Sequence, residues 1–268
     1  MNDKPVIVTV EEGIAEIRLN RPKVLNAVSR EMLALLREAV AEIAARGDVG
    51  VCTITGDGRA FCAGADLTDP MMGNELPREQ RGDNCAKVMD TEINAMLRDF
   101  RALRLPKLAV VNGITAGGGV GLALVADIVI AARSASFLVP FVPKLGIIPD
   151  LGATWHLPRL LGRARAIGVA MLGDPVTAEQ AEAWGLIWKC VDDDKLVEEA
   201  RSIATRLRDG PRRAQVELSD LIDQGFVNSF SDHLDAERDV QRVVCQTDDV
   251  EEAMAAFKEK RPPRFKGR

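Results

Sequence analysis

The first half of the chain alternates apolar runs typical of strands with apolar residues at helical spacing. Val6–Val10 and Ile14–Leu19 lie on either side of Glu11-Glu12-Gly13, and the second run alternates apolar and polar positions. This pattern predicts a β-hairpin with one buried face. Ser29 stands where a helix N-cap belongs, and apolar residues then recur every three or four positions. We expect this helix to end at Gly47.

The pattern continues into three further strands and another helix. Val49–Thr55, Leu108–Val111 and Ile128–Ala131 are short apolar runs of strand type. Met89 to Leu103 carries apolar residues at helical spacing, and the polar stretch from Thr68 to Asn84 reads as a long surface loop. Strands that alternate with helices predict an α/β core with largely parallel pairing.

The last third of the chain has a helical pattern throughout. Thr177 and Gln180 form a capping box, which predicts a helix that ends at Gly185. Beyond about residue 194 only helical patterns occur: Asp194–Asp209, Pro211–Gln224, Asp232–Cys245 and Asp249–Lys260. We therefore divide the chain into an α/β core, residues 1–195, and a C-terminal helical region, residues 196–268.

Charge and composition narrow the classes of function. The 268 residues carry a formal net charge of −5, whereas nucleic-acid-binding surfaces show a basic excess, so we expect no nucleic-acid partner. No apolar run reaches the roughly 18 residues of a membrane span. The N-terminus lacks the layout of a secretory signal. The five cysteines are scattered without a paired spacing, which favours neither disulfides nor a metal site. We expect a cytoplasmic protein that binds no metal.

Two segments rich in small residues are the candidate functional elements. Phe61–Leu67 and Ala116–Leu122 each join an apolar run to residues with almost no side chain. Such backbone can approach a ligand closely, and two N–H groups from separate loops could form an oxyanion hole. The segments lack the glycine spacing of a dinucleotide site and the Gly-Lys-Ser/Thr of a P-loop. A single carbonyl or oxyanion is therefore the expected ligand group.

Several motifs together resemble the crotonase family, also called the enoyl-CoA hydratase/isomerase family. They occur in the family's order and cover nearly the whole chain: Asn20-Arg21-Pro22 with Leu25-Asn26-Ala27, Phe61–Leu67, Asn112-Gly113 with Gly117-Gly118-Gly119, and Thr177–Leu186. The resemblance implies a spiral of ββα units and a C-terminal helical region for trimerisation. It also implies an acyl-CoA thioester substrate, no cofactor beyond the coenzyme A of that substrate, and a homotrimer or a hexamer of two trimers.

The resemblance also implies the residues of the site. The backbone N–H groups of Ala65 and Gly118 match the oxyanion hole that holds the thioester oxygen. The matching substrate- and CoA-binding positions are Lys23, Val24, Leu25, Ala63, Asp66, Leu67, Gly117, Phe257 and Lys260. Phe257 and Lys260 lie in the terminal helix, which in this family can reach CoA from a neighbouring subunit. A solvated basic helix end is the alternative interpretation of that segment.

The sequence departs from the family pattern at both glutamates of the hydratases. Gly121 stands at the first position, and Pro140–Lys144, at the second, contains no carboxylate. Asp150 follows among apolar neighbours, which would raise its pKa and suit it to moving protons near neutral pH. A Pro-Asp turn that caps the next helix is the alternative. Some isomerases of the family are similar in placing an aspartate after such a turn. The resemblance to the epoxyphenylacetyl-CoA isomerase type of phenylacetate degradation is carried by three segments, 148–150, 155–160 and 184–188.

Three functions follow from these observations. The first is an acyl-CoA isomerase that moves a double bond from the 3- to the 2-position, or opens a ring epoxide, with Asp150 as its acid/base. The second is an enoyl-CoA hydratase that adds water to a 2-enoyl-CoA. The third is a non-catalytic relative that binds CoA or RNA. The acidic charge balance disfavours RNA binding.

Overall fold

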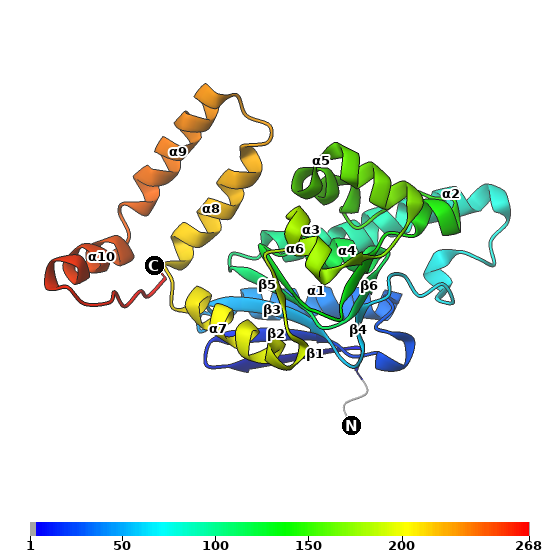
Figure 1. The fold of residues 1–268 in the computed structure, drawn as a ribbon, viewed down its shortest axis with the longest axis horizontal. Coiled ribbons are helices and arrows are strands. Elements are labelled where there is room, and N and C mark those ends of the chain that lie inside the picture. Colours follow the sequence, from blue (N-terminus) through cyan, green and yellow to red (C-terminus); the bar gives the residue numbers. More distant parts are fainter. Residues whose placement is uncertain (1–3, 268) are drawn as a thin grey trace.

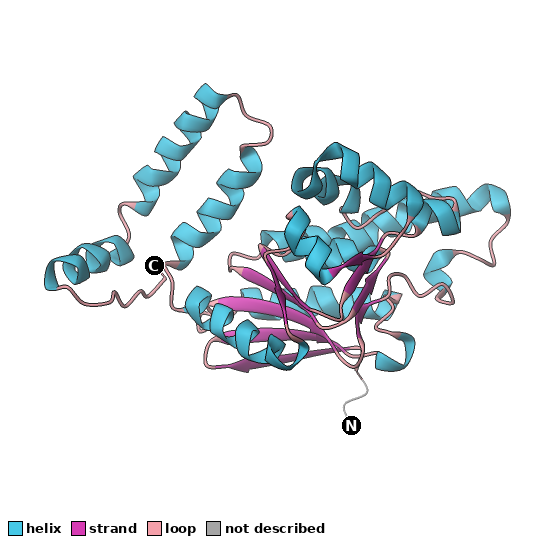
Figure 2. Ribbon diagram, in the orientation of Figure 1, coloured by secondary structure: helices cyan, strands magenta, loops and turns pink. Residues whose placement is uncertain are grey.

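A computed structural model describes residues 4–267 and places the strands in two sheets with helices around them (Figures 1 and 2). The larger sheet has the order β1-β2-β3-β5-β7-β10. Its first two strands pair antiparallel, which confirms the predicted hairpin, and the others pair in parallel. The strands are β1 (Val6–Glu11), β2 (Ile14–Leu19), β3 (Val51–Gly56), β5 (Lys107–Val111), β7 (Ile128–Ala132) and β10 (Lys189–Val191).

The smaller sheet consists of very short strands that the apolar pattern did not predict. Its order is β4-β6-β8-β9, and the strands are β4 (Ala60–Cys62), β6 (Ile114–Ala116), β8 (Ser136–Leu138) and β9 (Val176–Thr177). In sequence, β3 leads into β4, β5 into β6 and β7 into β8, and helices follow each pair. The core is therefore a repeated ββα unit.

The first long helix, α1 (Arg30–Ala44), begins as predicted. The Ser29 hydroxyl oxygen accepts a hydrogen bond from the Met32 N–H at 3.2 Å, so Ser29 is the N-cap. The expectation that Gly47 ends the helix is wrong, because the C-cap is Ala45. Ile43 is the last buried apolar residue of this helix, so further turns would gain no burial.

The predicted loop from Thr68 to Asn84 contains helical structure and is corrected here. A 3₁₀ turn spans Pro70–Met72, and α2 (Arg78–Val88) begins inside the stretch. Val88 is the one buried residue of α2, so the sequence carries no apolar face that could have revealed it. The next predicted helix is present as a π-helical turn, Met89–Ile93, followed by α3 (Asn94–Ala102).

Three helices follow the short strands of the second sheet. After β6 comes α4 (Gly118–Leu124), and after β8 come a π-helical turn, Phe141–Leu145, and α5 (Ala153–Leu172). No bounds were predicted for the helix after Asp150; this helix is α5, which contains Pro158 and is interrupted at Gly162. The capping box of Thr177 and Gln180 is confirmed at α6 (Ala178–Trp184), the helix after β9.

The four predicted C-terminal helices are confirmed, with ends shifted by a few residues: α7 (Leu196–Arg208), α8 (Arg212–Gln224), α9 (Phe230–Val244) and α10 (Asp248–Glu259). The first of them lies against the larger sheet and buries Leu196 and Ile203. The other three extend away from the sheets (Figure 1). The prediction assigns α7 to the C-terminal region, but this helix packs against the larger sheet. The division between residues 195 and 196 stays a prediction.

Candidate active site

The two segments rich in small residues lie side by side at the ends of β4 and β6. Val28 pairs with Ala65, and the Val28 N–H donates to the Gly64 carbonyl at 2.7 Å. A methyl group added at Gly64 would lie 3.2 Å from the Gly118 nitrogen. Within residues 4–267 neither the Ala65 nor the Gly118 N–H has a hydrogen-bond acceptor. The two N–H groups expected to form an oxyanion hole therefore come from adjacent loops, and both are free for a ligand.

Each glycine of the triplet has its own reason to lack a side chain. Gly117 has φ 55° and ψ −129°, a conformation that a residue with a Cβ rarely adopts. A Cβ at Gly118 would lie 2.9 Å from the Leu151 Cδ1. A Cβ at Gly119 would lie 2.3 Å from the Cys62 carbonyl oxygen. These contacts seat the start of α4 directly against β4, where its first residue, Gly118, is buried and the Gly118 N–H has no acceptor within residues 4–267.

Asp150 lies beside this helix start. Its Oδ1 is 3.6 Å from the position of a Cβ at Gly118, and this oxygen is buried without a hydrogen-bond partner. Burial raises the pKa of Asp150 to about 6, against a smaller lowering effect of its own backbone N–H. The carboxyl can therefore gain and lose a proton near neutral pH. The structure brings Asp150, Ala65 and Gly118 together as the sequence predicts, and their chemical roles stay predictions.

The turn that carries Asp150 contains a residue that sequence reasoning missed. Leu151 has φ 46° and Gly152 has φ 77°, so two successive residues are left-handed just before α5. The Leu151 carbonyl oxygen would lie 2.1 Å from a Cβ at Gly121. Leu151 therefore fills the place where hydratases of the family carry a glutamate. Gly121 itself was the signal, but the sequence could not show which residue packs against it.

The segment of Lys23, Val24 and Leu25 lies next to the loop after β4. The Leu25 carbonyl accepts a hydrogen bond from the Ala63 N–H at 2.9 Å. Asp66 accepts from the Thr68 hydroxyl at 2.7 Å and pairs with Arg21 at 2.9 Å. These two hydrogen bonds hold the pKa of Asp66 below its usual range, and the bond from Thr68 has the larger effect.

Two apolar side chains at the edges of these loops stay accessible. Val24 and Leu67 are 45% and 50% exposed. The predicted substrate-binding residues of the N-terminal half thus lie in the oxyanion-hole loops or, in the case of Lys23, Val24 and Leu25, in the segment next to them.

The two predicted CoA-binding residues of the terminal helix lie elsewhere. Phe257 is in α10 and is 84% exposed, and Lys260 is the left-handed residue that follows this helix. Figure 1 shows α10 at one end of the molecule, well separated from α4 and α5. These residues do not reach the site of their own chain, and their predicted role in a neighbouring subunit's site stays a prediction.

Comparison with known proteins agrees with this geometry. A family model described as enoyl-CoA hydratase/isomerase matches residues 9–268. The chain belongs to the enoyl-CoA hydratase/isomerase family. It is 41% identical to the "1,2-epoxyphenylacetyl-CoA isomerase" of Escherichia coli, over 97% of each chain. It is 40% identical to a "Probable enoyl-CoA hydratase" of Rhodobacter capsulatus, over 97% of this chain and 96% of that one.

A solved structure shares the fold of this family member. The crystal structure of an enoyl-CoA hydratase from Bacillus anthracis matches with a TM-score of 0.88 and 32% identity, over 98% of this chain and 100% of that one. The predicted crotonase-like α/β fold is therefore confirmed, and the protein is an enzyme of this family. Because the relatives of this enzyme include both an isomerase and a hydratase, membership alone does not decide the reaction.

The burial of the Asp150 carboxyl leads to a prediction about stability. Asp150→Asn is expected to raise the free energy of unfolding by about 2 kcal/mol at about pH 8, and by less than about 1 kcal/mol at about pH 4. The pKa of Asp150 is raised in the folded chain, to about 6 from 3.8. The folded state tolerates the protonated Asp150 carboxyl better than the ionised one. The contribution of this carboxyl to stability is therefore fully present below the pKa of the unfolded chain, and it is lost as the pH rises through the pKa of the folded chain. Urea unfolding at both pH values measures the difference, and a difference independent of pH would contradict it.

Proposed function

We propose that this enzyme is an acyl-CoA isomerase in which Asp150 is the single acid/base. The observation that carries the proposal is the position of the Asp150 carboxyl, 3.6 Å from a Cβ placed at Gly118, next to two unbonded N–H groups. Leu151 supports it too, because its carbonyl oxygen closes the space at Gly121 in which a second carboxylate would have to lie. One base beside an oxyanion hole suits proton transfer better than the addition of water.

The proposed reaction begins with the thioester carbonyl oxygen bound by the Ala65 and Gly118 N–H groups. The Asp150 carboxylate takes a proton from carbon 2, and the electron pair of that C–H bond moves toward the thioester, whose oxygen becomes an oxyanion. The two N–H donors stabilise this enolate, and each contributes about 3 kcal/mol in comparable sites. The Asp150 carboxyl then returns the proton to carbon 4 of a 3-enoyl group, so the double bond moves to the 2-position.

The same enolate can react in a second way when the substrate carries a ring epoxide. If the ring next to carbon 2 carries an epoxide, the electron pair of the enolate breaks a C–O bond, and the alkoxide takes the proton from Asp150. The similarity to the "1,2-epoxyphenylacetyl-CoA isomerase" makes this substrate class part of the proposal. For a ring-epoxide substrate of this kind, the pathway that we propose is phenylacetate catabolism.

The experiment that tests the proposal offers the protein three thioesters separately: a 3-enoyl-CoA, a 2-enoyl-CoA and 1,2-epoxyphenylacetyl-CoA. Mass and ultraviolet spectra identify the products. Isomerisation leaves the mass unchanged and moves the double bond or opens the epoxide. A gain of one water from the 2-enoyl-CoA would show a hydratase, and no product from any of the three would favour a binding protein without this chemistry.

The C-terminal helices support an oligomer, which we propose is a homotrimer or a hexamer. The 15-residue helix α9 has no buried residue in a single chain. The exposed large apolar residues of α8–α10 and the loop between α8 and α9 are Leu218, Ile222, Phe226, Val227, Phe230, Leu234, Val243, Met254 and Phe257. Apolar side chains in such numbers indicate a contact surface, and a second copy of this chain is the proposed partner.

A charge in this surface is expected to break the oligomer. Phe230 is 80% exposed in a single chain, and Phe230→Asp would place a carboxylate in the contact. We expect the molar mass in light scattering to fall from that of a trimer or hexamer toward that of one chain. The control is Val197→Asp on α7, since Val197 is 79% exposed but lies outside α8–α10. An oligomer that survives Phe230→Asp, or a wild type that is monomeric, would contradict the prediction.

The remaining expectations concern location and partners. No helix among residues 4–267 is both long and apolar enough to cross a bilayer. A cytoplasmic location, the absence of a nucleic-acid partner and a role of Phe257 and Lys260 at a neighbouring CoA site stay predictions.

A further inference from the structure

The first turn of α5 connects the Asp150 turn to Trp155. The N–H groups of Trp155 and His156 donate to the Gly152 carbonyl at 2.9 and 3.0 Å. The Ala153 N–H donates to the Asp150 carbonyl at 2.9 Å. A movement of the Trp155 backbone would therefore pull on the residues next to Asp150.

Two guanidinium groups hold the Trp155 ring. The Arg159 Cζ lies 3.9 Å from the ring centroid, and the Arg101 Cζ lies 4.8 Å from it. Arg159 also donates to the Trp155 carbonyl at 3.0 Å. Both distances are within the range of cation–π attraction. The side chain and the backbone of Trp155 are thus restrained together.

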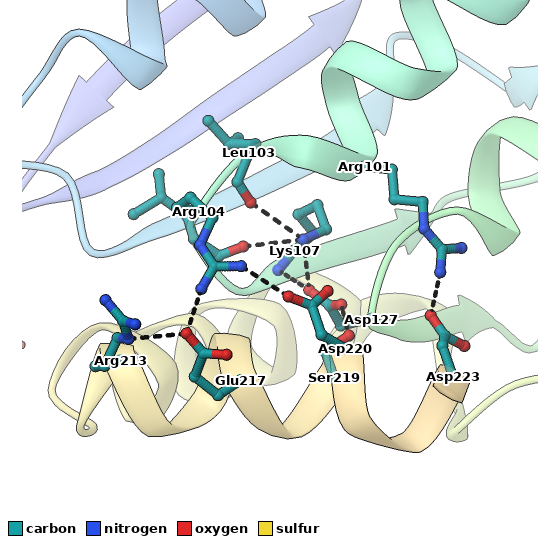
Figure 3. A network of polar contacts seen from close by, with 11 residues as sticks. Arg101, Leu103, Arg104, Lys107, Asp127, Arg213, Glu217, Ser219, Asp220 and Asp223 are labelled. Atoms are coloured by element: carbon teal, nitrogen blue, oxygen red, sulfur yellow. Dashed lines mark hydrogen bonds and ion pairs between the residues drawn. The ribbon is translucent and has the colours of Figure 1, made fainter. Parts of the chain in front are cut away.

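The two arginines also approach the C-terminal end of α8 and the loop that follows it. Arg101 donates to the Asp223 carboxylate, as Figure 3 shows, and the Arg159 Cζ lies 5.5 Å from the Phe226 ring. A second set of contacts on the same helix involves Arg104, which pairs with Asp220 at 2.7 Å and with Glu217 at 2.6 Å. Among residues 4–267 the cation–π pairs of Trp155 involve Arg101 and Arg159 and not Arg104, so the two sets can be separated by mutation.

We propose that Trp155, Arg101, Arg159, Asp223 and Phe226 form a positioning cluster that lets α8 hold the Asp150 turn in place. The proposal rests on the proposed catalytic role of Asp150. None of the five residues touches the reacting atoms; they act through the first turn of α5. The C-terminal helices, which are otherwise separate from the site, would then set the geometry of the acid/base.

The titration of Asp150 can be followed in the pH–rate profile without interference from the neighbouring His156. Burial, followed by the charges of Arg101 and Arg159, lowers the pKa of His156 to about 4. His156 is therefore neutral where Asp150 titrates, with its pKa raised to about 6. A looser turn admits water to the Asp150 carboxylate and lowers its pKa toward the ordinary value. The acidic limb of the pH–rate profile would then move to lower pH.

The first test compares two tryptophan variants of the full-length protein. Trp155→Leu removes the ring between the two guanidiniums, and Trp188→Leu is the matched control, because Trp188 is 70% exposed and has no ring contact within residues 4–267. For Trp155→Leu we expect kcat to fall about tenfold with KM within about twofold, since positioning rather than binding is lost. The acidic limb should shift to lower pH only in this variant.

The second test keeps Trp155 and changes one charge on α8. Asp223→Asn breaks the pair with Arg101, whereas Asp220→Asn removes an equal charge one turn earlier and affects only Arg104. We expect a loss in kcat of about threefold for the first variant, as suits an exposed pair, and no change for the second. Equal effects of the two variants would point to general electrostatics and overturn the proposal.

A measurement without substrate separates this inference from the proposed function. Carboxyl ¹³C NMR, assigned with Asp150→Asn, follows the titration of Asp150 in each variant. A lower pKa in Trp155→Leu and Asp223→Asn, with the controls unchanged, supports the cluster even if no thioester is turned over. In that case only the proposed function fails. An unchanged pKa of Asp150 in both variants overturns the cluster whatever the activity.

Discussion

Replacing Asp150 by asparagine is expected to lower kcat for the isomerisation of a 3-enoyl-CoA by about 10³-fold, the typical contribution of a positioned acid/base. Asparagine has nearly the same shape but cannot accept the proton from carbon 2. The oxyanion hole consists of backbone N–H groups of Ala65 and Gly118, so it remains intact. We therefore expect the dissociation constant of a non-reactive acyl-CoA analogue to change by less than about threefold.

The control for this variant makes the same chemical change away from the site. Asp174→Asn alters an exposed carboxylate between α5 and β9, which has no side-chain partner in the described part of the chain, and should leave kcat unchanged. Stopped-flow absorbance at saturating substrate gives kcat, and calorimetric titration gives the affinity for the analogue. Turnover at the wild-type rate in Asp150→Asn would remove this residue from the mechanism.

Gly121→Ala is expected to lower the free energy of unfolding by about 3 kcal/mol and kcat by about 10²-fold. The added methyl group would lie 2.1 Å from the Leu151 carbonyl oxygen, so the backbone of the turn has to move. Asp150 immediately precedes Leu151 and would move with it. Loss of stability and loss of activity should therefore occur together.

Another helical glycine provides the matched comparison. Gly168 in α5 has no atom within 4 Å of its Cβ position. Gly168→Ala is expected to stabilise the protein by about 0.5 kcal/mol, because glycine costs backbone entropy in a helix. The test compares the free energy of unfolding, from denaturant titration, and kcat between Gly121→Ala and Gly168→Ala. A Gly121→Ala protein as stable and active as Gly168→Ala would show that the turn adapts without cost.

Local signals predicted those elements whose sequences carry them. The hairpin of β1 and β2, the Ser29 cap and the capping box at Thr177 depend on neighbouring residues, and all three are confirmed. In contrast, α2 exposes nearly all of its side chains and therefore shows no apolar face. The strands of the smaller sheet are two or three residues long, too short for an alternating pattern.

The site shows a similar limit. Glycine spacing and the Asp150 turn were visible in the sequence, because small residues and a lone carboxylate stand out there. The filling of Gly121 by the Leu151 backbone and the stacking of Arg159 on Trp155 depend on how separate elements pack. Such contacts are tertiary, so no local pattern of residues could predict them.

The contact between Gly121 and Leu151 also bears on how activities diverge within this family. One nucleotide change can turn a glycine codon into a glutamate codon, which would restore the carboxylate that hydratases carry at this position. In this chain the new side chain would meet the Leu151 carbonyl first, so the existing acid/base would be displaced before a second one could work. A mutational path from the proposed isomerase to a hydratase must therefore rebuild the turn at Asp150 before position 121 changes.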